Sequence, residues 1–238
     1  MICIVGRGNV ASHLNLALKD KMEVRIVNPH TLEGFPLEAE IVLICVADKA
    51  IKEVIKKLPA LKKSTVLAHT AGSVPMNVLK GKSENIGVFY PLQTFTKGVE
   101  LDYSDIPFFI EGNNNYSFEK LSSLASCISR NVREANSEQR KKLHLASVIA
   151  CNFSNELASI SNNILKDCGM EFKMLLPLMK QMVKKLESVS PEEAQTGPAC
   201  RGDIEVIDMH LKMLENYPAY QNLYKNLSYM INPDLGIN

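Results

Sequence analysis

A glycine-containing turn near the start of the chain has the residue types and spacing of a phosphate-binding loop. The segment Gly6-Arg7-Gly8-Asn9-Val10-Ala11 fits the pattern G-x-G-x-x-A and lies between an apolar run and an amphipathic pattern. Gly6 allows a tight strand-to-helix turn, Gly8 lets the backbone approach a pyrophosphate, and Ala11 lets the helix pack closely on the strand. The helix N-terminus then offers free N–H groups to the anion. The pattern predicts dinucleotide binding by Gly6, Arg7, Gly8, Asn9 and Val10.

The residues after the second expected strand indicate which dinucleotide, NAD or NADP, the protein binds. A strand expected over 23–27 is followed by Asn28-Pro29-His30-Thr31, where NAD-binding proteins usually place an acid that bonds the ribose 2′-hydroxyl. An acid would repel a 2′-phosphate, whereas Asn28 and Thr31 could hydrogen bond to one. The segment therefore favours NADP over NAD. A plain turn at Asn28-Pro29 is compatible with this interpretation.

Further segments follow expected strands and should face the same crevice, because ligands bind outside the carboxyl ends of parallel strands. Val46-Ala47-Asp48 would lie beside the nicotinamide half, with Asp48 as a helix N-cap rather than a catalytic acid. In His69-Thr70-Ala71-Gly72-Ser73, a functional His69 and a core histidine are equally expected. Tyr90-Pro91-Leu92-Gln93-Thr94 either lines the pocket or is only a proline-stiffened loop. The predicted cofactor contacts here are Val46, Ala47, Thr70, Ala71 and Gly72.

A polar stripe runs along the long helix expected from Ser137 to about residue 167. At 100° per residue one side of this helix carries His144, Asn155, Ser159 and Asn162, with Asn152 nearby. The stripe could be a solvated face, but it is rich in amides and hydroxyls rather than charges. If its start faces the nucleotide crevice, His144 and Asn152 could bond a substrate and pass a proton. The predicted catalytic residues are His144, Asn152 and His69.

A second candidate site lies in the loop Thr196-Gly197-Pro198-Ala199-Cys200-Arg201-Gly202-Asp203. Arg201 could bind a substrate carboxylate in bidentate fashion. Asp203 is suited to cap the helix expected over 204–215, and His210 follows it at nearly the same angular position. The predicted substrate-binding residues are Arg201, Asp203 and His210. An Arg201–Asp203 pair that only stabilises the loop is equally plausible.

The pattern of apolar residues predicts that the elements that position these residues belong to two domains. Short apolar runs alternate with helical patterns up to residue 136, which predicts an α/β domain with a doubly wound, mostly parallel sheet. From Ser137 onward only helical patterns occur. We therefore expect a dinucleotide-binding domain over 1–136 and an all-α domain for substrate binding and dimerisation over 137–238. The expected helices of the second domain span 137–167, 172–187, 204–215 and 218–230.

Composition excludes several classes of protein. The 238 residues carry 27 Lys and Arg against 26 Asp and Glu, so there is no broad field to attract nucleic acid or a membrane. No apolar run approaches the roughly 20 residues of a bilayer span, and the N-terminus lacks the pattern of a signal peptide. The six cysteines form no CxxC pair, which predicts reduced, mostly buried thiols in a cytoplasmic protein without a metal site.

A homodimer is expected through the helical domain. The long helix carries an apolar stripe that includes Ile149, Phe153 and Leu157, and further apolar surface comes from methionines. These methionines are Met174, Met179, Met182 and Met213.

Several motifs resemble a known family. GRGNVA at 6–11 and ICVADKAI at 44–51 resemble pyrroline-5-carboxylate reductases and related 6-phosphogluconate dehydrogenase-like NADP oxidoreductases. HTAGS at 69–73, YPLQTF at 90–95, HLASVIACN at 144–152 and TGPACRGD with His210 are similar to a narrower group. That group comprises bacterial Rossmann-like proteins, named as oxidoreductases, with a C-terminal helical domain of unknown function. The resemblance spans the whole chain and implies a Rossmann domain, a helical dimerisation domain and NADP binding. Tyr90 departs from the histidine common at its position in related dehydrogenases.

These observations predict an NADP-dependent oxidoreductase that acts on a small, carboxylated imino or keto substrate. The alternative is a non-catalytic NADP-binding regulatory or interaction protein, because no single residue identifies itself as the essential acid or base. A third reading, a transferase that uses S-adenosylmethionine, suits the glycine turn less well.

Overall fold

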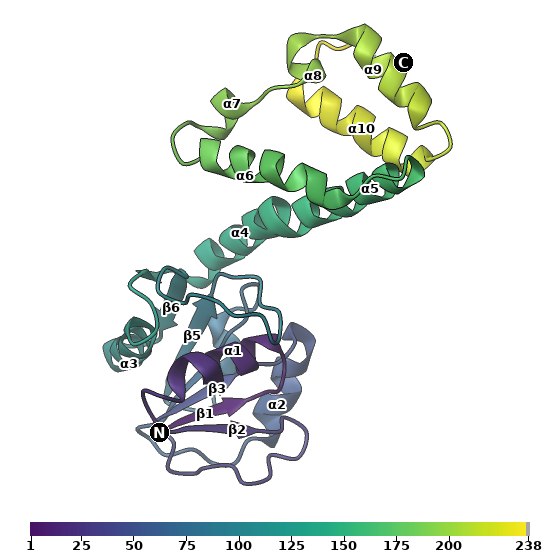
Figure 1. Cartoon of the computed structure of the whole chain (residues 1–238). Helices are drawn as coiled ribbons and strands as arrows, with labels where there is room; N and C mark the ends of the chain where they lie inside the picture. Colours follow the sequence, from purple (N-terminus) through teal and green to yellow (C-terminus); the bar gives the residue numbers. More distant parts are fainter. Residues whose placement is uncertain (237–238) are drawn as a thin grey trace. The chain divides into compact units, whose positions relative to one another are not determined.

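The computed structural model describes residues 1–236, and its N-terminal part is built on one seven-stranded sheet (Figure 1). The strand order is β2-β1-β3-β4-β5-β6-β7. The first five strands are parallel, β6 is antiparallel to β5, and β7 is parallel to β6. The strands are β1 (Ile2–Val5), β2 (Val24–Val27), β3 (Ile41–Ile44), β4 (Val66–His69), β5 (Asn85–Pro91), β6 (Phe108–Gly112) and β7 (Val132–Glu134). The predicted doubly wound, mostly parallel sheet is confirmed.

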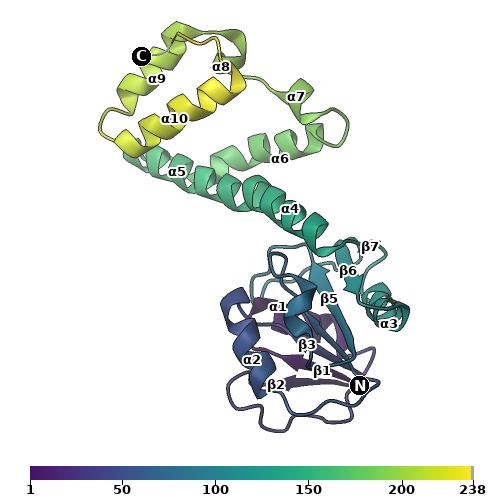
Figure 2. The same cartoon turned by 180° about the vertical axis from the view of Figure 1, so that it is seen from behind.

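The apolar runs of β1, β3 and β4 form strands that are buried on both faces, and Figures 1 and 2 show the helices that lie beside the sheet. In β1, Ile2 and Ile4 pack toward α1 (Asn9–Leu18) and α3 (Asn115–Ser126). The alternate residues Cys3 and Val5 pack toward α2 (Ile51–Lys57) on the other face. Because successive side chains of a strand point to opposite faces, an unbroken apolar run is the pattern that such a sheet requires.

The parallel strands place five loops at one edge of the sheet. Strands β1 to β4 pair in parallel register, and β5 continues that direction, so their carboxyl ends share this edge. The order changes direction between β1 and β3, which is where open α/β sheets form a ligand crevice. The glycine turn follows β1, and η1 (Asp48–Ala50) follows β3.

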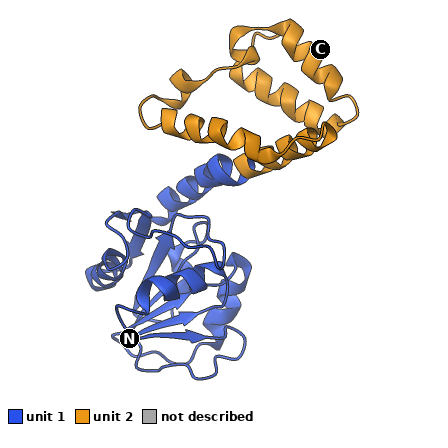
Figure 3. Cartoon of the chain, in the orientation of Figure 1, with its two compact units in different colours: residues 1–153 blue, residues 154–238 orange. Residues whose placement is uncertain are grey.

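The chain divides into two compact units, residues 1–153 and residues 154–238 (Figure 3). The last strand ends at Glu134, and α4 (Ser137–Ser147) belongs to the first unit together with a π-helix (Val148–Phe153). The domain boundary at residue 136 stays a prediction, because the change from strands to helices and the division into compact units fall at different places.

The second unit is helical. Its longer helices are α5 (Ser154–Asp167), α6 (Leu176–Lys185), α9 (Ile204–Met213) and α10 (Pro218–Ile231). Three short helices accompany them: η4 (Phe172–Leu175), α7 (Pro191–Ala194) and α8 (Pro198–Arg201). All residues from 137 to 167 are helical, as the sequence predicts, but the predicted regular periodicity is interrupted by the π-helix.

The cysteine prediction is partly wrong. Cys3 and Cys45 are buried, but the other four thiols are exposed: Cys127, Cys151, Cys168 and Cys200. The two buried residues belong to the apolar runs of the sheet. The other four lie outside those runs, on helices or at helix ends, so nothing in the pattern around them required burial. No helix among residues 1–236 is long and apolar enough to span a bilayer.

Candidate active site

The glycine turn after β1 is shaped by a close approach to β3. Gly6 has a φ of +156°, and a Cβ atom at this position would lie 2.1 Å from the backbone oxygen of Cys45. No side chain fits there without moving the backbone of the neighbouring strand. Gly6 therefore holds the ends of β1 and β3 together at the topological switch point.

Gly8 has the opposite surroundings. It is the N-cap of α1 with a φ of −79°, its helix has no side-chain cap, and no atom lies within 4 Å of the position that a Cβ would take. Arg7, Gly8 and Asn9 are exposed. The first N–H groups of α1 therefore have no side-chain cap, so an anion at this end of the helix would meet both these donors and the positive end of the helix dipole. This arrangement fits the pyrophosphate of a dinucleotide.

The loop after β5 is fastened to α1. The Asn9 side-chain amide donates to the Phe95 carbonyl at 2.8 Å. His13 is fully buried, and hydrogen bonds link its Nε2 to the Thr96 carbonyl and its Nδ1 to the Tyr103 hydroxyl, each at 2.8 Å. These bonds fix the loop beside the helix that begins the predicted phosphate site.

Hydrogen bonds from backbone N–H groups to side-chain oxygens stabilise the turn after β2. Asn28 Oδ1 accepts from the backbone N–H of His30 at 3.0 Å, and Thr31 Oγ1 accepts from that of Glu33 at 3.4 Å. His30 and Thr31 are exposed, and Asn28 is half-buried. The roles of Asn28 and Thr31 toward a 2′-phosphate stay predictions.

The loops after β3 and β4 are joined through Asp48. The Ser73 hydroxyl donates to the Asp48 carboxylate. Asp48 is the first residue of η1, and the N-cap is Ala47, so the prediction that Asp48 caps this helix is wrong. Its carboxylate bonds Ser73 instead of the backbone N–H groups of its own helix. Val46, Ala47, Thr70, Ala71 and Gly72 lie in these two loops, and their cofactor contacts stay predictions.

His69 is enclosed at the end of β4. Its exposed fraction is 0%, and Nδ1 accepts the backbone N–H of Ala71 at 3.2 Å. Burial lowers the pKa of His69 to about 4, and the positive charge of Arg140 contributes to the lowering. Nε2 has no hydrogen-bond partner among residues 1–236. The side chain does not line the pocket described next, and its catalytic role stays a prediction.

Tyr90 and His144 form a hydrogen-bonded pair. The Tyr90 hydroxyl lies 3.1 Å from Nδ1 of His144, and the two rings meet edge to face. Tyr90 is the last residue but one of β5 and has 8% of its surface exposed, and His144 lies in the last turn of α4. Burial raises the pKa of Tyr90, with Arg140 opposing and Asp48 reinforcing the shift. The phenol is therefore protonated at neutral pH.

The loop after β4 closes against this pair at Gly72. A Cβ on Gly72 would lie 2.8 Å from His144 Nδ1 and 2.9 Å from the Tyr90 hydroxyl oxygen. Three segments therefore meet at the two polar groups: the end of β5, α4 and the backbone at Gly72. The predicted cofactor loop and the predicted catalytic histidine are brought into direct contact.

The pair opens into a pocket of about 500 Å³ in the first unit. It is lined by Tyr90, Leu92, Gln93, Thr94, His144, Ser147, Val148, Ala150, Cys151 and Asn152. Two of the three predicted catalytic residues, His144 and Asn152, thus share one pocket. Its lining offers hydroxyl, amide and imidazole groups, which can bond and protonate a small polar ligand.

The π-helix is the reason that Asn152 faces the pocket. At 100° per residue, Asn152 would lie about 80° away from His144 around the helix. An i→i+5 turn takes up one extra residue, which rotates the following side chains back by about 100°. The regular stripe predicted from His144 onward is therefore wrong beyond Ser147, and Asn155, Ser159 and Asn162 belong to the second unit.

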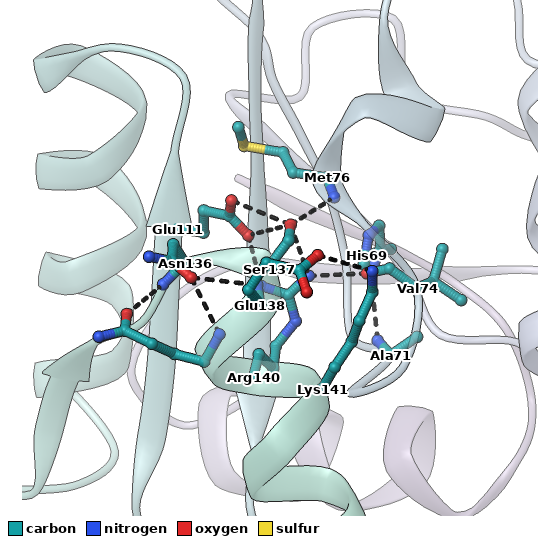
Figure 4. Close-up of polar contacts among 11 residues, drawn as sticks. His69, Ala71, Val74, Met76, Glu111, Asn136, Ser137, Glu138, Arg140 and Lys141 are labelled. Carbon is teal, nitrogen blue, oxygen red and sulfur yellow. Dashed lines mark hydrogen bonds and ion pairs between the residues drawn. The ribbon is translucent and has the colours of Figure 1, made fainter.

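A buried ion pair anchors the start of α4 (Figure 4). Arg140 has 0% exposure, binds the Glu111 carboxylate of β6 and donates to the Val74 carbonyl at 2.7 Å. Ser137 donates to Glu111 at 2.9 Å and accepts the Met76 N–H at 3.1 Å. Because Arg140 lies one turn before His144, this network determines how α4 presents its histidine to Tyr90.

The predicted substrate-binding residues lie in the second unit. Arg201 Nη2 pairs with Asp203 Oδ2 at 2.7 Å, with 62% of the arginine side chain exposed. Asp203 occupies the N-cap position of α9 without a side-chain bond to that helix. His210 bonds the Tyr224 hydroxyl at 2.9 Å and borders a separate pocket with Asp167 and Tyr217. The loop-stabilising pair is thus present, and substrate roles of Arg201, Asp203 and His210 stay predictions.

Two groups near the pocket are not among the predicted catalytic residues. Tyr90 departs from the histidine common at its position in related dehydrogenases, but lining of the pocket is one of the two alternatives predicted for YPLQT, and the structure confirms it. Arg140 carried no signal, because an arginine in a charged stretch of helix is normally a surface residue.

The model of the family described as a domain of unknown function, DUF2520, matches residues 106–231. This chain belongs to the DUF2520 family. The family likeness drawn from the sequence motifs is thereby confirmed. No curated protein sequence matches the chain.

Solved structures resemble the chain over its whole length. A Bacteroides fragilis protein, named provisionally as an NADP oxidoreductase, has 36% identity and a TM-score of 0.87, with 98% of this chain and 97% of that chain covered. A Thermotoga maritima protein has 26% identity and a TM-score of 0.82, with 98% of each chain covered. Pyrroline carboxylate reductase of Plasmodium falciparum with NADP bound has 12% identity and a TM-score of 0.63, covering 97% and 96%, and shares the fold.

Proposed function

We propose that this member of the DUF2520 family is an NADP-dependent oxidoreductase that transfers hydride to or from the carbon of a C=O or C=N bond in a small substrate. The observation that carries the proposal is the uncapped N-terminus of α1, with open space at Gly8. The name of the Bacteroides fragilis relative supports the same cofactor and reaction class.

The residues of this chain would divide the binding of NADP among three loops. The backbone from Gly6 to Val10 would hold the pyrophosphate, and Asn28 with Thr31 would bond the 2′-phosphate. The loops after β3 and β4 would lie along the nicotinamide half. Bound there, the nicotinamide would supply the hydride. The substrate would occupy the pocket beside His144 and Asn152. A substrate carboxylate bound by Arg201 remains a prediction.

Titration with NADPH and NADH, followed by cofactor fluorescence, tests the cofactor assignment. We expect the wild type to bind NADPH more tightly than NADH. Gly8→Ala should weaken NADPH binding at least about tenfold, because the methyl group occupies the space of the pyrophosphate. The unfolding free energy should change by less than about 1 kcal/mol, because no protein atom is near and the φ of −79° suits alanine.

Gly236→Ala is the matched control, because Gly236 also has open space around it but lies outside the predicted cofactor segments. Absence of NADPH and NADH binding to the wild type would contradict the proposal. Tighter binding of NADH would overturn only the interpretation of Asn28. Binding of NADPH without turnover of a panel of keto acids and cyclic imines would favour the non-catalytic alternative.

We also propose that the protein is a homodimer through its helical unit. Neither α5 nor α6 buries a residue within the chain, and Leu178 and Met230 are 69% and 80% exposed. Soluble monomers rarely leave so much apolar surface uncovered. Leu178→Lys should lower the apparent mass in sedimentation, whereas Leu37→Lys, on an exposed leucine of the first unit, should not. A wild-type protein that sediments as a monomer would contradict this proposal.

A further inference from the structure

Tyr90 and His144 form a hydrogen-bonded pair in the pocket. The sequence alone predicts no role that the two residues would perform together. We propose that the Tyr90 hydroxyl exchanges a proton with the reacting oxygen or nitrogen of the substrate, and that His144 restores the proton to Tyr90. This inference rests on the proposed oxidoreductase function and names the proton-transfer groups of that site.

The placement of the pair supports this role. Tyr90 and His144 both line the pocket of about 500 Å³, and their hydrogen bond of 3.1 Å is short enough for direct proton transfer. The backbone at Gly72 lies against both groups, within the loop that we propose to lie along the nicotinamide half. A substrate in the pocket would therefore meet the phenol on the side from which the cofactor loop approaches.

The His13–Tyr103 pair is an example of a tyrosine–histidine hydrogen bond with a structural role. His13 is fully buried, and both of its ring nitrogens are occupied, by the Tyr103 hydroxyl and the Thr96 carbonyl. His144 is half-buried, and only its Nδ1 has a hydrogen-bond partner among residues 1–236. Its Nε2 is left for water. A proton can therefore pass from solvent through His144 to Tyr90, whereas the His13 pair offers no such route.

The surrounding charges suit a phenol that donates. Burial raises the pKa of Tyr90, which keeps the hydroxyl protonated before the reaction. Arg140 on α4 lowers this pKa, and Asp48 on η1 raises it. The arginine charge stabilises the phenolate that forms once the proton has left. Arg140 and Asp48 therefore tune the phenol from two different elements.

The proton balance of the reduction is simple. As hydride adds to the carbon of the C=O or C=N bond, the Tyr90 O–H bond breaks and a new O–H or N–H bond forms on the product. The phenolate then takes the proton from Nδ1 of neutral His144 while Nε2 takes a proton from solvent, so the imidazole stays neutral and ends in its Nε2–H tautomer. Exchange with solvent returns it to the Nδ1–H tautomer. In the oxidative direction each transfer is reversed.

Tyr90→Phe tests the role of the phenol and keeps the ring. We expect kcat on the keto-acid and cyclic-imine panel to fall at least about 100-fold, with KM and NADPH affinity within about twofold of the wild type. Tyr116→Phe is the matched control, because it also removes one tyrosine hydrogen bond, to the Ser64 carbonyl, but outside the pocket. Wild-type kcat in Tyr90→Phe would overturn the proposal.

His144→Asn separates a relay from a structural hydrogen bond. Asparagine can still bond the Tyr90 hydroxyl but cannot carry a proton at neutral pH. We expect kcat to fall about tenfold or more and the pH dependence of kcat to lose one ionisation. Full activity with an unchanged pH profile would mean that His144 only positions Tyr90, and would overturn its relay role.

A measurement without turnover keeps the inference independent of the substrate. Nitrogen-15 NMR of the histidine ring reports which nitrogen of His144 is protonated. We expect Tyr90→Phe, but not Tyr116→Phe, to change the Nδ1 signal and the tautomer ratio. An unchanged Nδ1 signal would mean that Tyr90 and His144 do not interact, and would overturn the proposal. If the signal changes and NADPH binds but the wild type turns over no panel compound, the pair is supported and the proposed enzymatic function fails instead.

Discussion

The first unit buries apolar side chains on both faces of its sheet, whereas the part of the second unit that the structure describes, residues 154–236, has a small cluster of four buried residues: Ala199, Ile207, Leu211 and Leu235. Each unit has an arginine–carboxylate pair, and the two pairs differ in how much of their side chains is exposed to solvent. Arg140 and Glu111 are enclosed in the first unit, with 0% and 15% of their side chains exposed. Arg201 and Asp203 in the second unit are 62% and 37% exposed. A rigid sheet can enclose charge at a defined site, while a thinly packed helical unit leaves its pair in solvent.

The largest expected effect is the loss of the enclosed pair. Arg140→Met removes the partner of Glu111 and should lower the free energy of unfolding by about 3–5 kcal/mol, measured by urea denaturation. Adding Glu111→Leu should recover much of the loss, because no uncompensated charge is then buried. If Arg140→Met lowers the free energy of unfolding by less than about 1 kcal/mol, the enclosed pair contributes no more to stability than the exposed pair, and the contrast between the two units is wrong.

A smaller effect concerns the buried histidine of the first unit. The pKa of His69 lies at about 4, below the ordinary value near 6.5, so between these values only the unfolded chain takes up the proton. Stability is therefore highest above pH 6.5 and falls as the pH drops toward 4, by about 3 kcal/mol in total.

His69→Asn is the variant that isolates this contribution, because asparagine can still accept the Ala71 N–H but does not titrate. Urea unfolding of wild type and variant at pH 7 and pH 4.5 measures the difference. The variant should lose less stability than the wild type on acidification. Equal losses would show that other groups carry the acid sensitivity.

The smallest effect is expected for the exposed pair of the second unit. Arg201→Met should change the free energy of unfolding by less than about 1 kcal/mol, because water already solvates both charges. Any larger effect of this variant should appear in substrate KM, which would support Arg201 as the carboxylate anchor. A stability loss comparable to that of Arg140→Met would erase the distinction between the two pairs.

Much of the first unit follows from local sequence. Each apolar run formed a strand, and the glycine turn lies between β1 and α1 as predicted. These features depend on neighbouring residues, namely the unbroken apolar runs and a glycine next to a strand end. The same local patterns said little about burial in the second unit, where the apolar stripes of the helices lie exposed in the single chain.

The candidate site depended on contacts between distant residues. Tyr90 and His144 are 54 positions apart in sequence, and Glu111 and Arg140 are 29 apart. The register along α4 could not be extrapolated either, because one π-helical segment rotates Asn152 toward the pocket. No local periodicity encodes such an insertion.

The sequence by itself determined the α/β sheet, the position of the dinucleotide turn and the change to helices after the last strand, because periodicity and glycine placement act over a few residues. Only the tertiary structure decided which polar groups meet. It paired Tyr90 with His144 and enclosed Arg140 and His69. Burial and partners depend on what the rest of the chain packs around a residue. The same reason explains why an ordinary helical arginine became the anchor of the site.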